Sequence, residues 1–152
     1  MSPEELAARV LRVSQMQPPI DVSRLIEAHS VDLDSYSFAD DFLGMYLRIP
    51  RPVIVVNARH PRNRRRFTLA HEFCHHMLHK RTKHVLRFNA GRPATKEECY
   101  ANSFAAALLM PADLVCGLHK RGAPVDAMCT VMGVSKQAMN IRLNELRREG
   151  RL

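Results

Sequence analysis

The hydrophobic positions along the chain change their period near Pro61. Before that residue, strand-like alternation or short apolar runs occupy residues 31–38, 44–49 and 52–57, and the run at 53–56 gives the strongest strand pattern in the chain. An amphipathic helix is expected ahead of them at residues 1–17, and Asp21 is expected to cap a second, short helix. The strand-like segments together predict a small antiparallel sheet.

After Pro61 the apolar positions follow the period of an α-helix. One stripe of a helix ending near Lys80 is marked by Phe67, Ala70, Cys74, Met77 and Leu78. Residues 81–94 lose this period and carry several basic side chains, so we expect a basic loop there. Thr95 opens another helix, which should be almost wholly buried because only Asn102 and Ser103 are polar between residues 99 and 110.

A further helix is expected from Pro111 to about Gly122, where the tail begins. The tail places a Gly133-Val134-Ser135 turn between two short helices, which is typical of a helix-turn-helix. We therefore predict an α+β fold with two units, at residues 1–122 and 123–152.

The tail has two possible uses. Lys136, Gln137 and Asn140 would lie on the exposed early turns of its second helix, and these residue types can contact phosphates and bases. A lone unit with a local charge of only about +2 would bind DNA weakly, however. The tail could instead dock against the rest of the chain and cover it, so DNA contact stays a weakly supported alternative.

Composition and charge narrow the class of protein. The 152 residues fit one ordinary domain, 46% of them are hydrophobic, and the net charge of +8 suits an acidic protein partner or nucleic acid. No apolar run is long enough to span a membrane, and the N-terminus does not resemble a secretion signal. We expect a cytoplasmic protein without membrane contact, whose four cysteines are free thiols.

The strongest chemical pattern is the segment His71-Glu72-Phe73-Cys74-His75. Four residues turn a helix by about 400° and rise about 6 Å, so His71 and His75 leave the same face one turn apart and can share one zinc ion. Glu72 is placed to accept a proton from a water molecule at the metal rather than to bind the metal itself. This HExxH pattern indicates a zinc peptidase.

A catalytic zinc site needs a third protein ligand and an open fourth position. His79 lies about 12 Å along the helix from His71, His76 points about 140° away from it, and Cys74 would strain the tetrahedron. Glu97 and Glu98 are better candidates, because they begin a nearly apolar helix where a carboxylate needs a partner. Glu98 could instead complete a capping box with Thr95, and periodicity does not choose between the two glutamates.

Two linked segments resemble the ImmA/IrrE family of metallopeptidases. They are residues 67–79, FTLAHEFCHHMLH, and residues 98–111, ECYANSFAAALLMP. Residues 44–57 and 134–143 are also similar, so that the resemblance covers about residues 18–146. Because both motifs occur in the right order, the resemblance is far more specific than HExxH alone.

The resemblance implies a zincin-like domain followed by a small helix-turn-helix-like unit. It also implies that the protein cleaves or inactivates a helix-turn-helix repressor, which would be its substrate. In the family's second motif the ligand glutamate lies three residues before an Ala-Asn pair, which here corresponds to Glu98 before Ala101 and Asn102. Cys74 departs from the family, which usually has glycine at that position.

Three functions remain open from the sequence. The first is a zinc endopeptidase acting on an intracellular repressor, with His71, His75 and Glu98 on the metal and Glu72 as the base. The second is a DNA-binding regulator with a structural zinc, and the third is a metal-dependent toxin controlled by a partner. An open coordination position beside Glu72 would favour the first and third, whereas four protein ligands would close a structural site.

Overall fold

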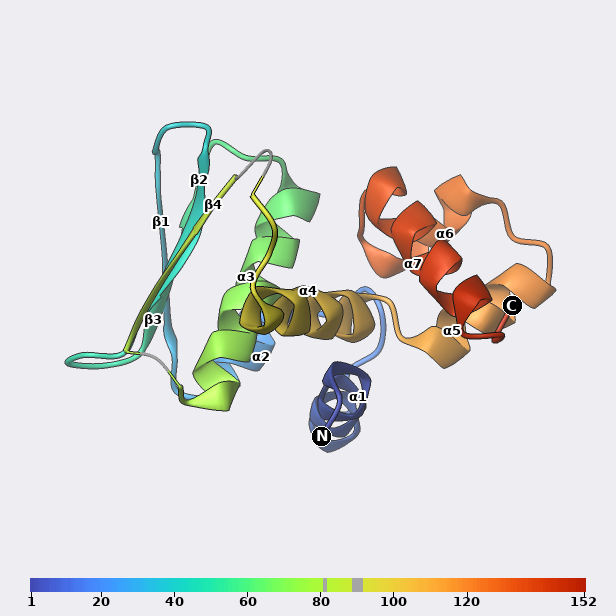
Figure 1. Ribbon diagram of the computed structural model, residues 1–152, viewed down its shortest axis with the longest axis horizontal. Coiled ribbons are helices and arrows are strands. Elements are labelled where there is room, and N and C mark those ends of the chain that lie inside the picture. Colours follow the sequence, from blue (N-terminus) through green and yellow to red (C-terminus); the bar gives the residue numbers. More distant parts are fainter. Residues whose placement is uncertain (81, 89–91) are drawn as a thin grey trace.

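The computed structural model describes residues 1–80, 82–88 and 92–152, which form seven helices and four strands in an α+β arrangement (Figure 1). In chain order the elements are α1 (Pro3–Ser14), α2 (Val22–Ala28), β1 (Asp32–Tyr36), β2 (Phe42–Leu47), β3 (Val53–Asn57), α3 (Arg62–Leu78), β4 (Lys83–Arg87), α4 (Lys96–Leu109), α5 (Ala112–Lys120), α6 (Val125–Met132) and α7 (Lys136–Arg148).

The sheet is mixed, so the prediction of an antiparallel sheet was wrong. Its strands lie in the order β1-β3-β2-β4, with β1 parallel to β3 and the other two pairs antiparallel. The chain reverses its direction between β1 and β2 and again between β2 and β3, so β1 and β3 run in the same direction. Because β3 and not β2 lies beside β1, the first pair in the sheet is parallel. An alternating sequence pattern predicts strands but carries no information about their direction.

The fourth strand lies where the sequence predicted a loop. Within residues 81–94, the segment Lys83–Arg87 pairs with β2 and forms one edge of the sheet, while residues 81 and 89–91 of that predicted loop lie outside the described residues. The strand is only five residues long and has an exposed basic residue at each end. Charged residues are common on edge strands, and here they hide the period-two pattern.

Helix α3 packs closely against one face of the sheet (Figure 1). Gly44 on β2 allows this approach, because a Cβ atom at that position would lie only 2.5 Å from the Thr68 methyl group on α3. The aromatic rings of Tyr46, Phe73 and Phe104 are fully buried between the sheet, α3 and α4. This packing fixes the face of α3 on which the HExxH motif lies.

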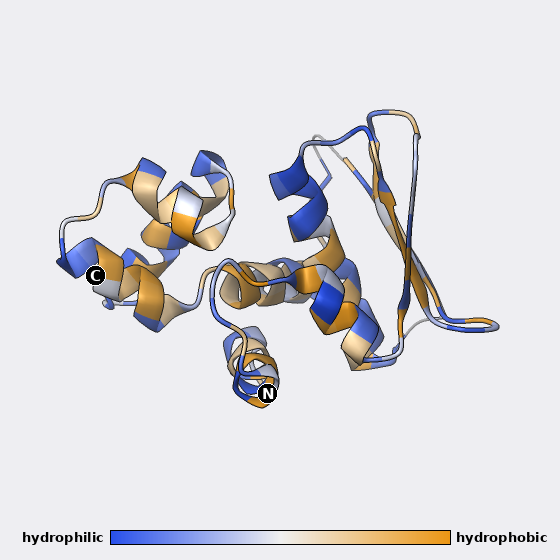
Figure 2. Ribbon diagram, turned by 180° about the vertical axis from the view of Figure 1, so that it is seen from behind, coloured by the Kyte–Doolittle hydropathy of each residue, from blue (hydrophilic) through white to orange (hydrophobic). Residues whose placement is uncertain are grey.

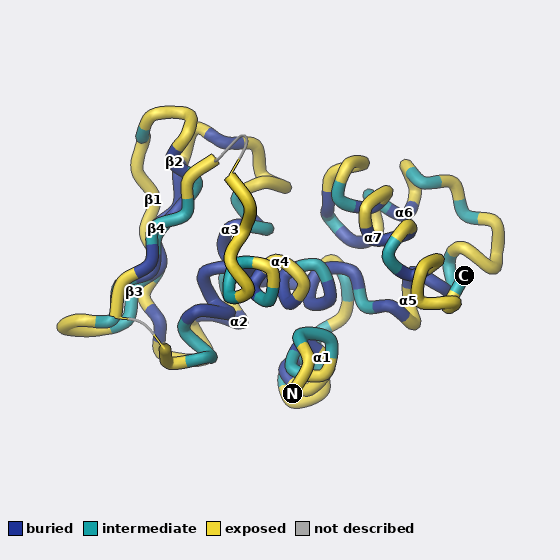
Figure 3. Tube along the Cα trace, viewed as in Figure 1, coloured by how far each residue is buried: buried dark blue, intermediate teal, exposed yellow. Residues whose placement is uncertain are grey.

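Helix α4 crosses α3 and is largely buried, as its apolar sequence predicted (Figure 3). Among the described residues no single helix is long and apolar enough to cross a membrane. Helices α4 and α5 have enough apolar length together, but they are bent by 53° relative to each other.

Helices α5, α6 and α7 form a lobe at the far end of α4 from the sheet (Figure 1). Two buried arginines join this lobe to the rest of the chain. Arg66, in the hydrophilic first turns of α3 (Figure 2), donates to the carbonyl oxygens of Ile20, Met132 and Gly133. Arg142 on α7 donates to Met110 O and forms an ion pair with Glu4 on α1 at 2.7 Å.

Candidate metal centre

His71 and His75 face each other on the buried side of α3. Their Nε2 atoms lie 3.2 Å apart, and both side chains are almost completely shielded from solvent. This geometry follows from the four-residue spacing, which places the two rings one helical turn apart.

Helix α4 adds a carboxylate to the two imidazoles. The Oε2 atom of Glu98 lies 3.3 Å from His71 Nε2, and its Oε1 atom lies 3.3 Å from His75 Nε2. The local fold orients this side chain, because the Thr95 hydroxyl accepts the Glu98 backbone N–H and starts the helix at that point. Glu97 occupies a different place, with its Oε1 atom 3.8 Å from the outer nitrogen of His75, Nδ1.

Asn102 orients the first histidine. Its side-chain carbonyl oxygen accepts a hydrogen bond from His71 Nδ1 at 2.9 Å. Because a carbonyl oxygen can only accept, Nδ1 carries the proton and Nε2 presents its lone pair to the centre of the cluster. Histidines that bind metals are usually fixed in this way. The sequence placed Asn102 in a motif but gave it no role.

A third histidine enters the cluster from the edge strand. His84 on β4 lies with its Nε2 atom 2.9 Å from Glu98 Oε1, and its ring stacks on that of His75 with centroids 3.8 Å apart. His84 was not among the residues expected at the site, because residues 81–94 were predicted to form a loop. Only the pairing of β4 with β2 brings it to the site.

Glu72 lies beside the cluster and is completely buried. Both of its carboxylate oxygens accept from His84 Nδ1, at 2.9 and 3.0 Å. Burial alone would lower the pKa of His84, but its hydrogen bonds with Glu72 and Glu98 outweigh that effect and raise the pKa to about 9. The facing imidazoles of His71, His75 and His84 hold the pKa of Glu98 far below its usual range.

The donor set fits a metal ion. One atom from each of His71, His75, His84 and Glu98 lies within 4.8 Å of all the others. In a tetrahedral site with bonds of about 2.0–2.1 Å, neighbouring donors are about 3.3 Å apart, close to the 3.2–3.3 Å that separate the donor atoms of His71, His75 and Glu98. Nitrogen and carboxylate donors are also the types that bind divalent transition metals.

The other histidines of α3 lie outside the cluster. His76 lies within 3.0 Å of the Tyr46 hydroxyl on the opposite side of the helix, and His79 is exposed beyond the helix end. The thiol of Cys74 is buried in the core, where burial and the nearby charges of Glu97 and Glu98 raise its pKa to about 12. A thiol with this pKa stays protonated at neutral pH and is a poor metal ligand.

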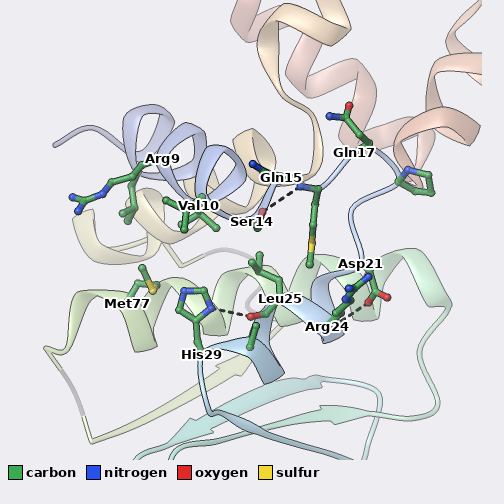
Figure 4. Close-up of a pocket in the computed structure, with 15 residues that line it drawn as sticks. Arg9, Val10, Ser14, Gln15, Gln17, Asp21, Arg24, Leu25, His29 and Met77 are labelled. Carbon is green, nitrogen blue, oxygen red and sulfur yellow. Dashed lines mark hydrogen bonds between the residues drawn. The ribbon is translucent and has the colours of Figure 1, made fainter.

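A cavity of about 1090 Å³ lies away from these donors. It lies between α1, α2 and the end of α3, with Val10, Leu25, His29 and Met77 in its walls (Figure 4). None of the four clustered donors lines it. This cavity is therefore separate from the His–Glu cluster.

Comparison with known structures supports the fold. A Mycobacterium tuberculosis transcriptional regulator superposes with a TM-score of 0.65 at 16% sequence identity, over 93% of this chain and 46% of that chain. The chain thus spans about half the length of the structure that it matches. No curated protein sequence matched the chain.

Comparison with protein families gives a more direct assignment. Residues 20–144 match the Peptidase_M78 family, described as the IrrE N-terminal-like domain. This match covers most of the chain and includes all four donors as well as Glu72. The resemblance to the ImmA/IrrE family is thereby confirmed: the chain belongs to the Peptidase_M78 family of metallopeptidases and has a zincin-like domain that carries a candidate metal site.

Proposed function

We propose that the protein is a zinc-dependent endopeptidase that cuts an intracellular protein. The observation that carries this proposal is the convergence of His71, His75 and Glu98, with facing donor atoms 3.2–3.3 Å apart, next to the buried carboxylate of Glu72. Two histidines and a glutamate are the ligand set of many zinc peptidases, which supports zinc as the metal.

Each residue has a distinct role in this proposal. His71, His75 and Glu98 hold the zinc, and Asn102 keeps His71 in the required tautomer. A bound zinc ion polarises the substrate carbonyl and lowers the pKa of a nearby water molecule. The Glu72 carboxylate then takes the proton from the attacking water and passes it to the leaving amine.

We further propose a helix-turn-helix repressor as the substrate and the cytoplasm as the place of action. Two features support the substrate. The chain belongs to a family of peptidases, whose substrates are proteins, and a protein of similar fold is named a transcriptional regulator. The net charge of +8 suits an acidic partner surface.

One observation favours a second function. His84 offers a fourth donor, and four protein ligands are typical of structural zinc. Helices α6 and α7, joined at Gly133, place Lys136, Gln137 and Asn140 on exposed positions at the start of α7. The second candidate is therefore a DNA-binding regulator in which zinc stabilises the fold.

Two variants separate these functions. Glu72→Gln keeps the size of the side chain and removes the base, so we expect it to fold, retain about one zinc per chain and lose nearly all cleavage. His71→Ala should lose both metal and cleavage, because it removes a ligand. Each variant is co-expressed with candidate helix-turn-helix repressors, repressor length is followed by mass spectrometry, and zinc is measured in the purified protein.

The regulator function predicts another pattern. If zinc is structural, Glu72→Gln should leave every function intact while His71→Ala unfolds the protein. Repressor inactivation that persists in Glu72→Gln, with the repressor at full length, would mean that the protein acts by binding, and the peptidase proposal would then fail.

A further inference from the structure

The side chains of the metal cluster are largely shielded from solvent. His71 and His75 are at most 1% exposed, and the side chains of His84 and Glu98 are only 7% and 22% exposed. The Nε2 atom of His84 points into the cluster and lies 2.9 Å from Glu98 Oε1. His84 thus occupies the side of the donor set that a three-ligand site would leave to water and substrate.

His84 also binds the proposed base. Its Nδ1 atom donates to both oxygens of Glu72, while its Nε2 atom faces the other donors. A carboxylate on one nitrogen and a metal on the other is the usual arrangement of a metal-binding histidine. In this arrangement Glu72 orients a ligand and its carboxylate is completely buried against His84, so one side chain covers both parts of the catalytic site.

His84 is carried by β4, one of the two edge strands of the sheet. Among the described residues β2 is the only strand beside β4, and the register of this pair is irregular between Phe42 and Gly44. Its opposite edge has no strand partner among the described residues. By contrast, α3 and α4, which carry the other three donors, pack against each other in the core.

We propose that His84 is a displaceable fourth ligand that keeps the metal site closed at rest. The four donors His71, His75, His84 and Glu98 hold the metal in the resting protein. Movement of β4 withdraws His84, which opens the fourth position and releases Glu72 at the same time. The catalytic consequence rests on the proposed peptidase function, whereas the ligand assignment does not.

X-ray absorption spectroscopy of the zinc-loaded full chain tests the ligand assignment directly. We expect three imidazoles per zinc in the wild type and two in His84→Ala, with zinc affinity in the variant lower by about 10-fold or more. Lys83→Ala, an exposed position on the same strand, is the matched control and should retain three. Two imidazoles in the wild type would overturn the proposal, and this measurement stands even if His84→Ala does not fold.

Access to the closed position is tested with acetohydroxamate, a small ligand that needs an open coordination site. In the cobalt-substituted protein it should change the visible spectrum of His84→Ala at concentrations that leave the wild type and Lys83→Ala unchanged. Equal binding to all three proteins would show that the site is already open and would overturn the proposal.

Peptide cleavage separates this proposal from the proposed function. We expect His84→Ala to cleave an unstructured peptide substrate faster than the wild type, because both the metal position and Glu72 are free. Slower cleavage with two imidazoles in the variant would make His84 a catalytic residue and overturn displacement. A third result is three imidazoles in the wild type and no cleavage by any of the proteins. It would reject the peptidase function, and it would also overturn displacement, because His84 would then be a permanent structural ligand.

Discussion

Two adjacent glutamates at the start of α4 have different geometries although their chemistry is the same. Both oxygens of Glu98 face the inner nitrogens of His71 and His75, whereas Glu97 approaches only the outer nitrogen of His75, at 3.8 Å. Neighbouring residues on a helix differ in direction by about 100°, so only one of them can point into the cluster. This difference predicts unequal effects on metal binding.

Glu98→Gln should weaken zinc binding by about 10-fold or more, because it removes an anionic ligand and not merely an outer partner. Glu97→Gln is the matched control and should change the affinity little. Competition with a chelating dye measures both affinities. Equal zinc affinity in wild type and Glu98→Gln would reject Glu98 as a ligand.

His76 links the stability of the protein to pH. Burial, with smaller contributions from the charges of His79, His29 and Arg48, lowers the pKa of His76 from its ordinary value to about 4. Its Nδ1 atom accepts a hydrogen bond from the buried Tyr46 hydroxyl at 3.0 Å. Between pH 6.5 and 4 the unfolded chain therefore binds more protons at this residue, and stability must fall as the pH falls.

The variant His76→Gln should reduce that pH dependence. Glutamine does not titrate, yet it retains an acceptor for the Tyr46 hydroxyl. We expect the metal-free wild type to lose more free energy of unfolding between pH 6.5 and 4.5 than metal-free His76→Gln does. Urea denaturation at both pH values measures this difference, and identical losses would show that His76 does not titrate in this range.

At the scale of elements, Arg66 couples α3 to the turn between α6 and α7. Its guanidinium donates to Met132 O and Gly133 O at that turn and to Ile20 O ahead of α2. Gly133 has a φ of +65°, and a Cβ atom there would lie 3.2 Å from the guanidinium. Glycine therefore serves both the left-handed turn and the close approach of the arginine.

Replacement of Arg66 should loosen the C-terminal lobe. Arg66→Met leaves three carbonyl oxygens without this donor, and we expect a loss of about 1–3 kcal/mol in the free energy of unfolding. Hydrogen exchange should increase in α6 and α7. Arg64→Met, at an exposed position of the same helix, is the control and should behave like the wild type. Unchanged exchange in Arg66→Met would show that the lobe is held elsewhere.

At the scale of the whole molecule, the metal donors all precede Gly122, and the C-terminal lobe follows it. The boundary predicted from the sequence therefore leaves the entire metal cluster in one part. The two parts still share contacts, because Arg142 reaches Met110 and Glu4, and Met132 and Leu146 belong to the common hydrophobic core.

A chain that ends at Gly122 tests whether the lobe selects the substrate. We expect this chain to melt at a lower temperature, because Arg66 loses two of its acceptors, but to retain its zinc. It should fail to cleave the natural target. Calorimetry, zinc analysis and a cleavage assay measure the three effects, and complete unfolding would show that the lobe is a necessary part of the core.

The spacing of residues along one helix was enough to predict two metal ligands and the adjacent carboxylate. The separation of His71 and His75 and the adjacent Glu72 form a recognisable pattern because a helix repeats every 3.6 residues, whatever packs around it. The apolar run of α4 likewise predicted a buried helix, and the order of two motifs predicted the family, which the match over residues 20–144 confirmed.

Tertiary structure alone decided the rest. The choice between Glu97 and Glu98 depends on how α4 is rotated against α3, and local periodicity leaves that rotation open. His84 reaches the cluster because β4 pairs with β2 thirty-eight residues away (Tyr46 with His84), and the parallel pairing of β1 with β3 follows from strand order. Contacts between residues distant in sequence leave no repeating pattern along the chain, so only the packed molecule shows that a fourth donor lies beside the other three.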